Sequence, residues 1–201
     1  IAYILEKAEN IELGDAPAQI TSCDHMKQYA AHLRSLICKG IGVDEADKPL
    51  AGMRIMVDAG NGAGGFYASE VLAPLGADVL PSMNLEPDGN FPVYVPNPES
   101  SVMIDSAAER VKQTKADFGI VFDTDVDRAG AVLPSDGGVI ALDRNRLIAL
   151  MTAILVRQYG PITVVTDSIT STGLTDFINS LGCRHHRFKR GYRNVINEAK
   201  R

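Results

Sequence analysis

The sequence is poor in cysteine, in excess positive charge and in long apolar runs. Its three cysteines (Cys23, Cys38 and Cys183) lie far apart and form no CxxC pair, so we interpret them as reduced thiols of a cytoplasmic protein. The net charge of −5 and the lack of a basic stripe argue against nucleic acid as a partner. The longest apolar run, Leu147 to Val156, is too short to span a bilayer, and no signal peptide is visible, so we expect no membrane partner.

The most specific pattern is an apolar strand, residues 118–122, that continues directly into three aspartates spaced two apart. Ionised carboxylates this close repel one another unless a cation neutralises them. Carboxylate oxygens are hard ligands that suit Mg²⁺, and a magnesium ion bound in this way usually completes its shell with phosphate oxygens. Arg128 follows at once, and a guanidinium group binds phosphate bidentately. The pattern therefore predicts a Mg²⁺ site at Asp123, Asp125 and Asp127 that acts on a phosphate ester.

Three other interpretations of this loop have to be weighed. An EF-hand counted from Asp123 is excluded, because Arg128 stands where glycine is needed and Pro134 where glutamate is needed. A solvated turn is a weaker interpretation for carboxylates that follow an apolar strand and precede arginine. A haloacid-dehalogenase-type phosphatase stays open, with Asp123 as the nucleophile and Asp125 as the acid/base, although it leaves Asp127 and Arg128 unexplained.

Strands and helices alternate along most of the chain. After a helix predicted to begin at Thr21 or Ser22 and to stop at Gly40, we expect strands at 53–59, 77–80 and 117–122, helices near 65–75 and 101–115, and a hairpin turning at 135–138. Such alternation implies a largely parallel sheet that is covered on both faces. The predicted fold class is α/β, a three-layer αβα arrangement with a mostly parallel mixed sheet, followed by an incomplete second α/β unit.

A second alternation of helices and strands begins at Asp143 and holds only two predicted strands, at 162–167 and 183–188. We therefore divide the chain into a connecting segment (1–20), a first domain (21–142) and part of another domain (143–201). Two strands are too little sheet to cover their helices, so we expect a fragment of a longer protein. Uncovered apolar faces and sheet edges predict that such a fragment self-associates.

Two further segments each have a chemical and a structural interpretation. Residues 60–65 follow a strand, open a helix and formally satisfy GxGxxG, but Asp58 would lie against a pyrophosphate. We therefore favour a tight turn that needs positive φ. The basic residues 185–190 end a predicted strand before Gly191, and they fit either a phosphate-facing loop at a helix N-terminus or a solvated surface turn.

Five segments, taken in order, resemble the α-D-phosphohexomutases, the phosphoglucomutase/phosphomannomutase superfamily. They are VDAGNGAGG (57–65), EPDGNFP with PNPE (86–99), ADFGIVFDTDVDR (116–128), NRL (145–147) and KRGY (189–192). The resemblance covers the second domain of that family and the start of the third. It implies that residues 1–20 connect from a first domain, that 21–142 form domain II with its metal loop, and that 143–201 form the N-terminal part of domain III.

The resemblance also implies roles for individual residues. Asp123, Asp125 and Asp127 match the family's Mg²⁺ ligands, Arg128 matches the arginine that faces the active-site phosphate, and Lys189 and Arg190 match a loop that lines the sugar-phosphate cleft. The intact enzyme would move a phosphoryl group between the C1 and C6 oxygens of a hexose phosphate. That reaction passes through a phosphoserine and a hexose bisphosphate.

The sequence departs from the family in three ways. Thr124 replaces the glycine of the family's DGD-x-DR loop, and Val93, Tyr94 and Val95 stand where a histidine pair is often found. The serine loop that carries the phosphoryl group belongs to the family's first domain, which the resemblance does not reach. We therefore expect this chain to be inactive by itself, and a non-catalytic paralogue that binds sugar phosphates stays open as an alternative.

Overall fold

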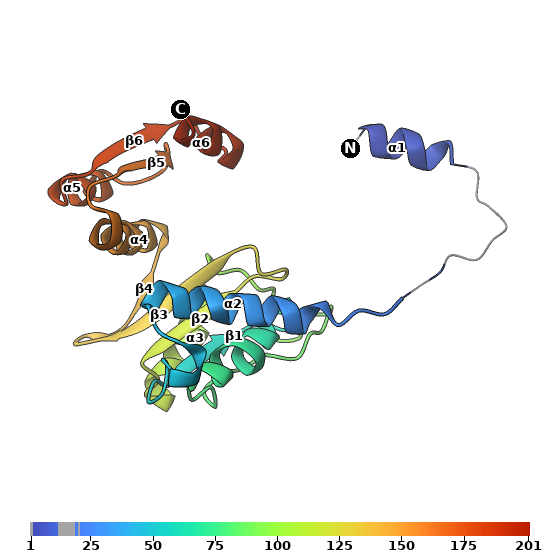
Figure 1. Cartoon of the computed structure of the whole chain (residues 1–201). Coiled ribbons are helices and arrows are strands. Elements are labelled where there is room, and N and C mark those ends of the chain that lie inside the picture. Colours follow the sequence, from blue (N-terminus) through green and yellow to red (C-terminus); the bar gives the residue numbers. More distant parts are fainter. Residues whose placement is uncertain (1, 12–18, 20) are drawn as a thin grey trace.

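The computed structural model describes residues 2–11, 19 and 21–201 and contains two α/β units (Figure 1). Much of the predicted connecting segment, 1–20, lies outside the described residues. Its described part holds helix α1 (Ala2–Glu9), in which no side chain is buried and for which the sequence showed no period. Among the described residues, no helix combines the length and the apolar composition needed to cross a membrane.

The first unit is built on a four-stranded sheet in the order β1 (Ile55–Asp58), β2 (Phe118–Phe122), β3 (Ala129–Ser135) and β4 (Gly138–Leu142). β1 pairs with β2 in parallel, and the β2–β3 and β3–β4 pairs are antiparallel. Ser135 pairs with Gly138, so the predicted hairpin is present with Asp136 and Gly137 as its two-residue turn. The α/β fold class with a mixed sheet is confirmed. The sheet is not mostly parallel as predicted, because the short connections between β2, β3 and β4 allow only antiparallel pairing.

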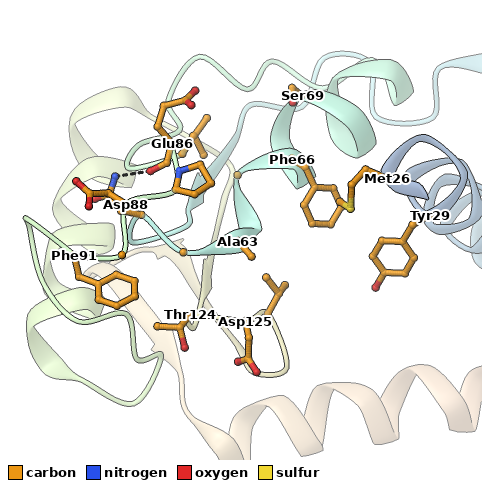
Figure 2. A pocket seen from close by; sticks show the side chains of 17 residues that line it. Met26, Tyr29, Ala63, Phe66, Ser69, Glu86, Asp88, Phe91, Thr124 and Asp125 are labelled. Carbon is orange, nitrogen blue, oxygen red and sulfur yellow. Dashed lines mark hydrogen bonds between the residues drawn. The ribbon is translucent and has the colours of Figure 1, made fainter. Parts of the chain in front are cut away.

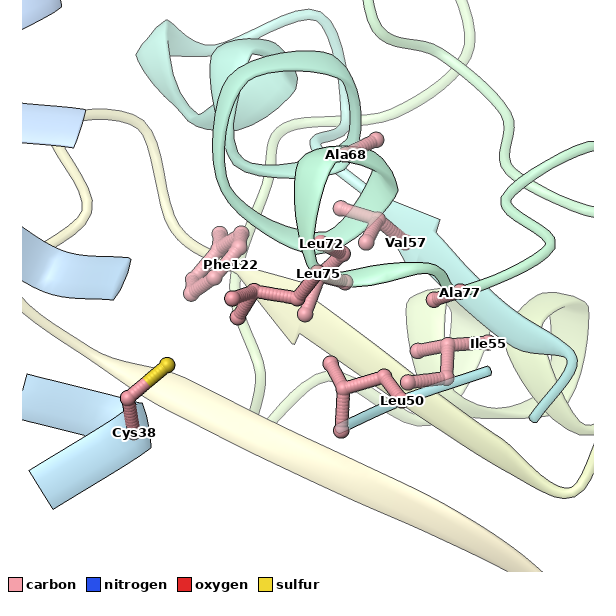
Figure 3. Close-up of a cluster of buried hydrophobic side chains, with 9 residues drawn as sticks. All are labelled: Cys38, Leu50, Ile55, Val57, Ala68, Leu72, Leu75, Ala77 and Phe122. Carbon is pink, nitrogen blue, oxygen red and sulfur yellow. The ribbon is translucent and has the colours of Figure 1, made fainter. Parts of the chain in front are cut away.

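Helical layers cover both faces of this sheet, which is why β1 is buried along its whole length. Successive side chains of a strand point to opposite faces. Ile55 and Val57 accordingly join a core cluster with Cys38 of α2 (His25–Ile41) and with the helical segment 63–75 (Figure 3). Met56 points the other way and packs with α3 (Ser101–Thr114). The arrangement has three layers, as predicted.

Three local predictions differ from the structure. Segment 77–80 is not a regular strand and contributes only a single bridge, between Arg54 and Asp78, because the Asp78 carboxylate turns back to accept the Leu80 N–H and Pro81 lacks a donor. The helix expected at 65–75 is a π-helical turn (Tyr67–Leu72) between two 3-10 turns (Ala63–Gly65 and Ala73–Leu75). Helix α2 begins later than predicted, with Asp24 as its cap, and ends at the left-handed Gly42.

The second unit follows the predicted order of elements: α4 (Arg144–Tyr159), β5 (Thr163–Asp167), α5 (Thr172–Ser180), β6 (Arg184–Phe188) and α6 (Tyr192–Ala199). β5 and β6 pair in parallel, and a small core forms around Leu174, Ile178 and Cys183. Apolar side chains of α4 and α6 remain exposed, Met151 and Tyr192 among them. Self-association through these faces stays a prediction.

Candidate metal and phosphate site

The predicted metal loop, residues 123–128, is the tight connection between the antiparallel strands β2 and β3. The Asp123 N–H donates to the Arg128 carbonyl (3.2 Å), and the Arg128 N–H donates back to Asp123 Oδ1 (3.0 Å). Val126 lies at the turn with φ +65°, a conformation that is strained for a β-branched residue. Thr124, which replaces the family's glycine, is not among the described residues with positive φ, so the replacement adds no backbone strain.

The three predicted aspartates lie together at the end of β2. One carboxylate oxygen from each of Asp123, Asp125 and Asp127 lies within 4.8 Å of the others. Asp123 is buried, whereas the other two are exposed. Three oxygen donors without nitrogen or sulfur suit a hard cation such as Mg²⁺, which usually keeps water or phosphate oxygens in its remaining positions. The donor set therefore fits the predicted ion.

Arg128 lies directly against this cluster. Its Nε donates to Asp123 Oδ2 at 2.8 Å and lies 3.5 Å from Asp127 Oδ1, while its Nη1 donates to Asn97 Oδ1 at 3.4 Å. Half of the guanidinium side chain is exposed. The guanidinium group is thus held on its carboxylate side and open on the other, which suits recognition of an anion next to the predicted metal ligands.

The carboxylates shift one another's pKa in opposite directions. Burial raises the pKa of Asp123, but hydrogen bonds from the Arg128 backbone, from Asp127 and from the Arg128 guanidinium outweigh it and hold that pKa below its ordinary value. The hydrogen bond with Asp123 raises the pKa of Asp127, with smaller contributions from burial and the nearby negative charges. A bound cation would stabilise the ionised form of a carboxylate cluster with this pattern.

The glycine-rich turn at residues 60–65 supports the metal loop. Gly60 and Asn61 have φ of +54° and +61°, which confirms the predicted tight turn with positive φ. The Ala63 N–H donates to the Thr124 carbonyl (2.9 Å), and a Cβ on Gly62 would come within 2.7 Å of the same oxygen. The glycines thus allow the close approach of two backbones, and they need no nucleotide to explain them.

Two clefts flank the metal loop. Figure 2 shows the first, of about 850 Å³, which is lined by Asp125 and by apolar side chains that include Met26, Tyr29 and Phe66. The second, of about 830 Å³, lies between the two units and is lined by Arg128 and by residues near the start of α4. The Arg144–Glu99 ion pair crosses between the units beside this cleft.

The other predicted residues lie elsewhere in the fold. Lys189 and Arg190 follow β6 in the second unit, where the Lys189 ammonium lies 5.8 Å from the Phe188 ring centroid and the Arg190 carbonyl accepts a bond from Asn194. No hydrogen bond or ion pair between described residues joins them to Arg128. Conversely, the sequence assigned no role to Asn97, although it lies in the PNP segment and contacts Arg128.

Comparison with known proteins places these features in a family. Residues 27–137 match the family model described as phosphoglucomutase/phosphomannomutase, alpha/beta/alpha domain II. Phosphomannomutase/phosphoglucomutase of Pseudomonas syringae is 33% identical over 149 residues, which is 74% of this chain and 31% of that protein. The Pseudomonas aeruginosa protein of the same name is 28% identical over 200 residues, 100% of this chain and 40% of that protein. The chain thus spans about a third of these relatives.

Solved structures agree on the fold. A phosphoglucomutase/phosphomannomutase family protein of Burkholderia thailandensis matches 88% of this chain and 36% of its own, with a TM-score of 0.71 at 24% identity. N-acetylphosphoglucosamine mutase of Aspergillus fumigatus, in complex with GlcNAc-6P and magnesium, matches 87% of this chain and 37% of its own, with a TM-score of 0.56 at 18% identity. Because the family model covers more than half of the sequence and includes the whole metal loop, this chain belongs to the phosphoglucomutase/phosphomannomutase family.

Proposed function

We propose that this chain supplies the Mg²⁺ site of a phosphohexomutase, which transfers a phosphoryl group between the C1 and C6 oxygens of a hexose phosphate. In this proposal residues 21–142 are domain II, 143–201 begin domain III, and 1–20 connect from a first domain that carries the phosphoserine. The observation that carries the proposal is the cluster of Asp123, Asp125 and Asp127 beside Arg128, inside the segment that matches the family's domain II.

The residues of the loop would have two roles, metal binding and phosphate recognition. The three carboxylates would hold Mg²⁺, which when bound neutralises charge on phosphate oxygens. Arg128, held by Asp123 and Asn97, would orient the phosphate through its open face. Because none of the 201 residues resembles the family's serine loop, we expect no turnover by this chain alone.

Ligands of related proteins support the choice of substrate class. The Aspergillus fumigatus enzyme was crystallised with GlcNAc-6P and magnesium, and its S69A variant with glucose 1,6-bisphosphate. We propose hexose phosphates and hexose bisphosphates as ligands here, with Lys189 and Arg190 lining their cleft in the longer protein.

Two alternative functions differ in what they require of Asp123. A haloacid-dehalogenase-type phosphatase would need it as a nucleophile, but the Asp123 side chain is only 1% exposed and both of its oxygens accept bonds from Arg128. That burial argues against nucleophilic attack. A non-catalytic paralogue that binds sugar phosphates needs only the metal loop. It would differ from the mutase by lacking the serine loop that carries the phosphoryl group.

The test of the metal site is Mg²⁺ titration calorimetry on this chain. The comparison is a variant in which Asp123, Asp125 and Asp127 are changed to Asn. A matched control changes Asp105, Asp136 and Asp176, three exposed aspartates outside the loop, and removes the same charge. We expect binding to persist in the control and to vanish in the loop variant. Equal binding by all three proteins would refute the metal assignment.

A second assay separates the phosphatase from the mutase. Hydrolysis of p-nitrophenyl phosphate in Mg²⁺ by this chain, abolished by Asp123→Asn, would establish the phosphatase. We expect no hydrolysis above background. In the full-length protein, phosphoryl transfer from glucose 1-phosphate would support the mutase, and binding without transfer would support the paralogue.

A further inference from the structure

A buried carboxylate outside the metal loop has no cationic partner. Asp58 ends β1 and is 0% exposed, and no ion pair between described residues includes it. Its Oδ1 accepts bonds from the Gly60 N–H (2.9 Å) and from Asn84 Nδ2 (3.0 Å). Its Oδ2 accepts a bond from the Tyr94 hydroxyl. A buried carboxylate depends on such donors, because an unpaired one is costly to keep from water.

Tyr94 is the donor that comes from furthest along the chain. Its hydroxyl also accepts a bond from Asn84 Nδ2 (3.0 Å), so Asp58, Asn84 and Tyr94 form a closed triangle of hydrogen bonds. Burial, together with the bond to Asp58, raises the pKa of Tyr94 to about 12. The hydroxyl therefore keeps its proton and donates throughout the physiological range.

This triangle anchors the long loop that follows the helical segment 63–75 and leads to α3, because it ties Asn84 and Tyr94 of that loop to the end of β1. After Tyr94, Pro96 lies so close to Gly60 that a Cβ there would approach the Pro96 Cβ to 2.7 Å. Pro98 lies close to Gly130, where a Cβ would approach the Pro98 Cβ to 3.1 Å. Apart from its contact with Arg128, segment 94–98 is thus held by the hydrogen bonds of Tyr94 and by two packing contacts.

Asn97 lies between those two packing contacts and reaches the metal site. Its Oδ1 accepts the Glu99 N–H (3.0 Å) and the Arg128 Nη1 (3.4 Å). Among the residues that the structure describes, Asn97 is the one hydrogen-bond partner of the Arg128 guanidinium group that lies outside the metal loop. A displacement of segment 94–98 would therefore release one side of Arg128 while leaving the aspartates in place.

We propose that Tyr94 is a positioning residue for Arg128: bound to Asp58 and Asn84, it sets the place of Asn97 and so the orientation of the guanidinium group beside the metal ligands. The part of this inference that concerns phosphate rests on the proposed function. The part that concerns Arg128 itself does not.

The direct test measures the Arg128 side chain by NMR. In a chain labelled with ¹⁵N-arginine, the signals of the Arg128 Nη–H groups, of which Nη1 donates to Asn97, are assigned by their loss in Arg128→Lys, and their hydrogen-exchange rate is then compared among variants. We expect Tyr94→Phe to raise that rate about threefold to tenfold, the change that loss of one hydrogen bond allows. Asn97→Ala should raise it equally, and Tyr94→His, which keeps a donor, should restore most of the protection.

Tyr67→Phe is the matched control. This half-buried tyrosine packs edge-on against Phe122 (5.3 Å between centroids), and its hydroxyl makes no hydrogen bond with any of the residues that the structure describes. We expect it to leave exchange at Arg128 unchanged. Folding of each variant is checked by circular dichroism. If Tyr94→Phe fails to fold, Asn97→Ala decides. Unchanged exchange in a folded Tyr94→Phe, or in Asn97→Ala, would overturn the proposal.

Phosphate binding supplies the second measurement. With Mg²⁺ present, we expect Tyr94→Phe to weaken the binding of inorganic phosphate about threefold to tenfold while the Mg²⁺ affinity stays within about twofold. An equal loss of both affinities would mean a merely structural role and would contradict the inference. If the wild-type chain binds no Mg²⁺, the proposed function fails, and exchange at Arg128 still decides the role of Tyr94.

Discussion

Changing Gly65 to alanine tests whether the glycine-rich turn is a packing requirement. Gly65 is buried, and a Cβ added there would lie 1.9 Å from the Leu85 carbonyl oxygen and 2.8 Å from its carbon. Normal contact between such atoms is about 3.5 Å, so one of the two backbone segments has to move. The clash involves backbone rather than a flexible side chain, so it cannot be relieved by a rotamer change.

The expected magnitude follows from two opposing effects. Overpacking of this kind destabilises the folded state by about 1–3 kcal/mol. Alanine also lowers the entropy of the unfolded chain, which stabilises the folded state by about 0.4–1 kcal/mol. We therefore expect Gly65→Ala to lower the free energy of unfolding of the first unit by about 1–2 kcal/mol. Leu85 directly follows Asn84, so the displacement should also weaken the hydrogen bonds at Asp58.

Urea unfolding followed by circular dichroism measures this change. Gly40→Ala is the matched control, since Gly40 lies inside α2 with no atom within 4 Å of an added Cβ. In that open helical position alanine should stabilise the protein by about 0.5–1 kcal/mol. The same substitution is thus expected to act with opposite signs at the two sites. A Gly65→Ala variant as stable as the wild type would refute the reasoning.

Three further predictions concern other parts of the chain. Because Val126 has φ +65°, Val126→Gly should be more stable than Val126→Ala by about 0.5–1 kcal/mol in urea, the reverse of the usual order. Burial, with the charges of Arg187 and His186, lowers the pKa of His185. In the folded state His185 therefore binds a proton less readily than in the unfolded state, where a histidine does so near pH 6.5. The stability of the wild type relative to His185→Gln should therefore fall as the pH drops from about 7.5 to 5.5, and a constant difference would contradict this. Arg144→Ala removes the exposed pair with Glu99 and should change unfolding in urea by less than about 1 kcal/mol.

The long periodic elements were predictable because their patterns are local. Helix α3, strand β2 and the β3–β4 hairpin lie where hydrophobic period and turn residues indicated. The strand at 77–80 was wrong because the Asp78 side chain competes for the local backbone. The helix at 65–75 was right in place but not in type, since π-helical and 3-10 turns leave no period distinct from an α-helix in so short a segment.

The site was predictable only in part, for a similar reason. The spacing of Asp123, Asp125 and Asp127 is visible in one short segment, and the fold brings their oxygens together. The contacts of Asn97 with Arg128 and of Tyr94 with Asp58 join residues 31 and 36 positions apart. No local sequence pattern predicts such contacts, because they depend on the path of the loop between the two residues.

The hairpin connection that forms the metal loop has a consequence for the order of folding. Strands β2, β3 and β4 occupy one continuous stretch, residues 118–142, and pair only with sequence neighbours or with β1. Pairing of β1 with β2 instead closes a segment of about 63 residues, which loses more chain entropy and is slower. We therefore expect these three strands to form first and to bring the aspartates together before the glycine-rich turn packs against the loop at Thr124. If these carboxylates hold Mg²⁺ as proposed, the ion would bind during refolding before β1 has paired, and Mg²⁺ should then speed the later steps.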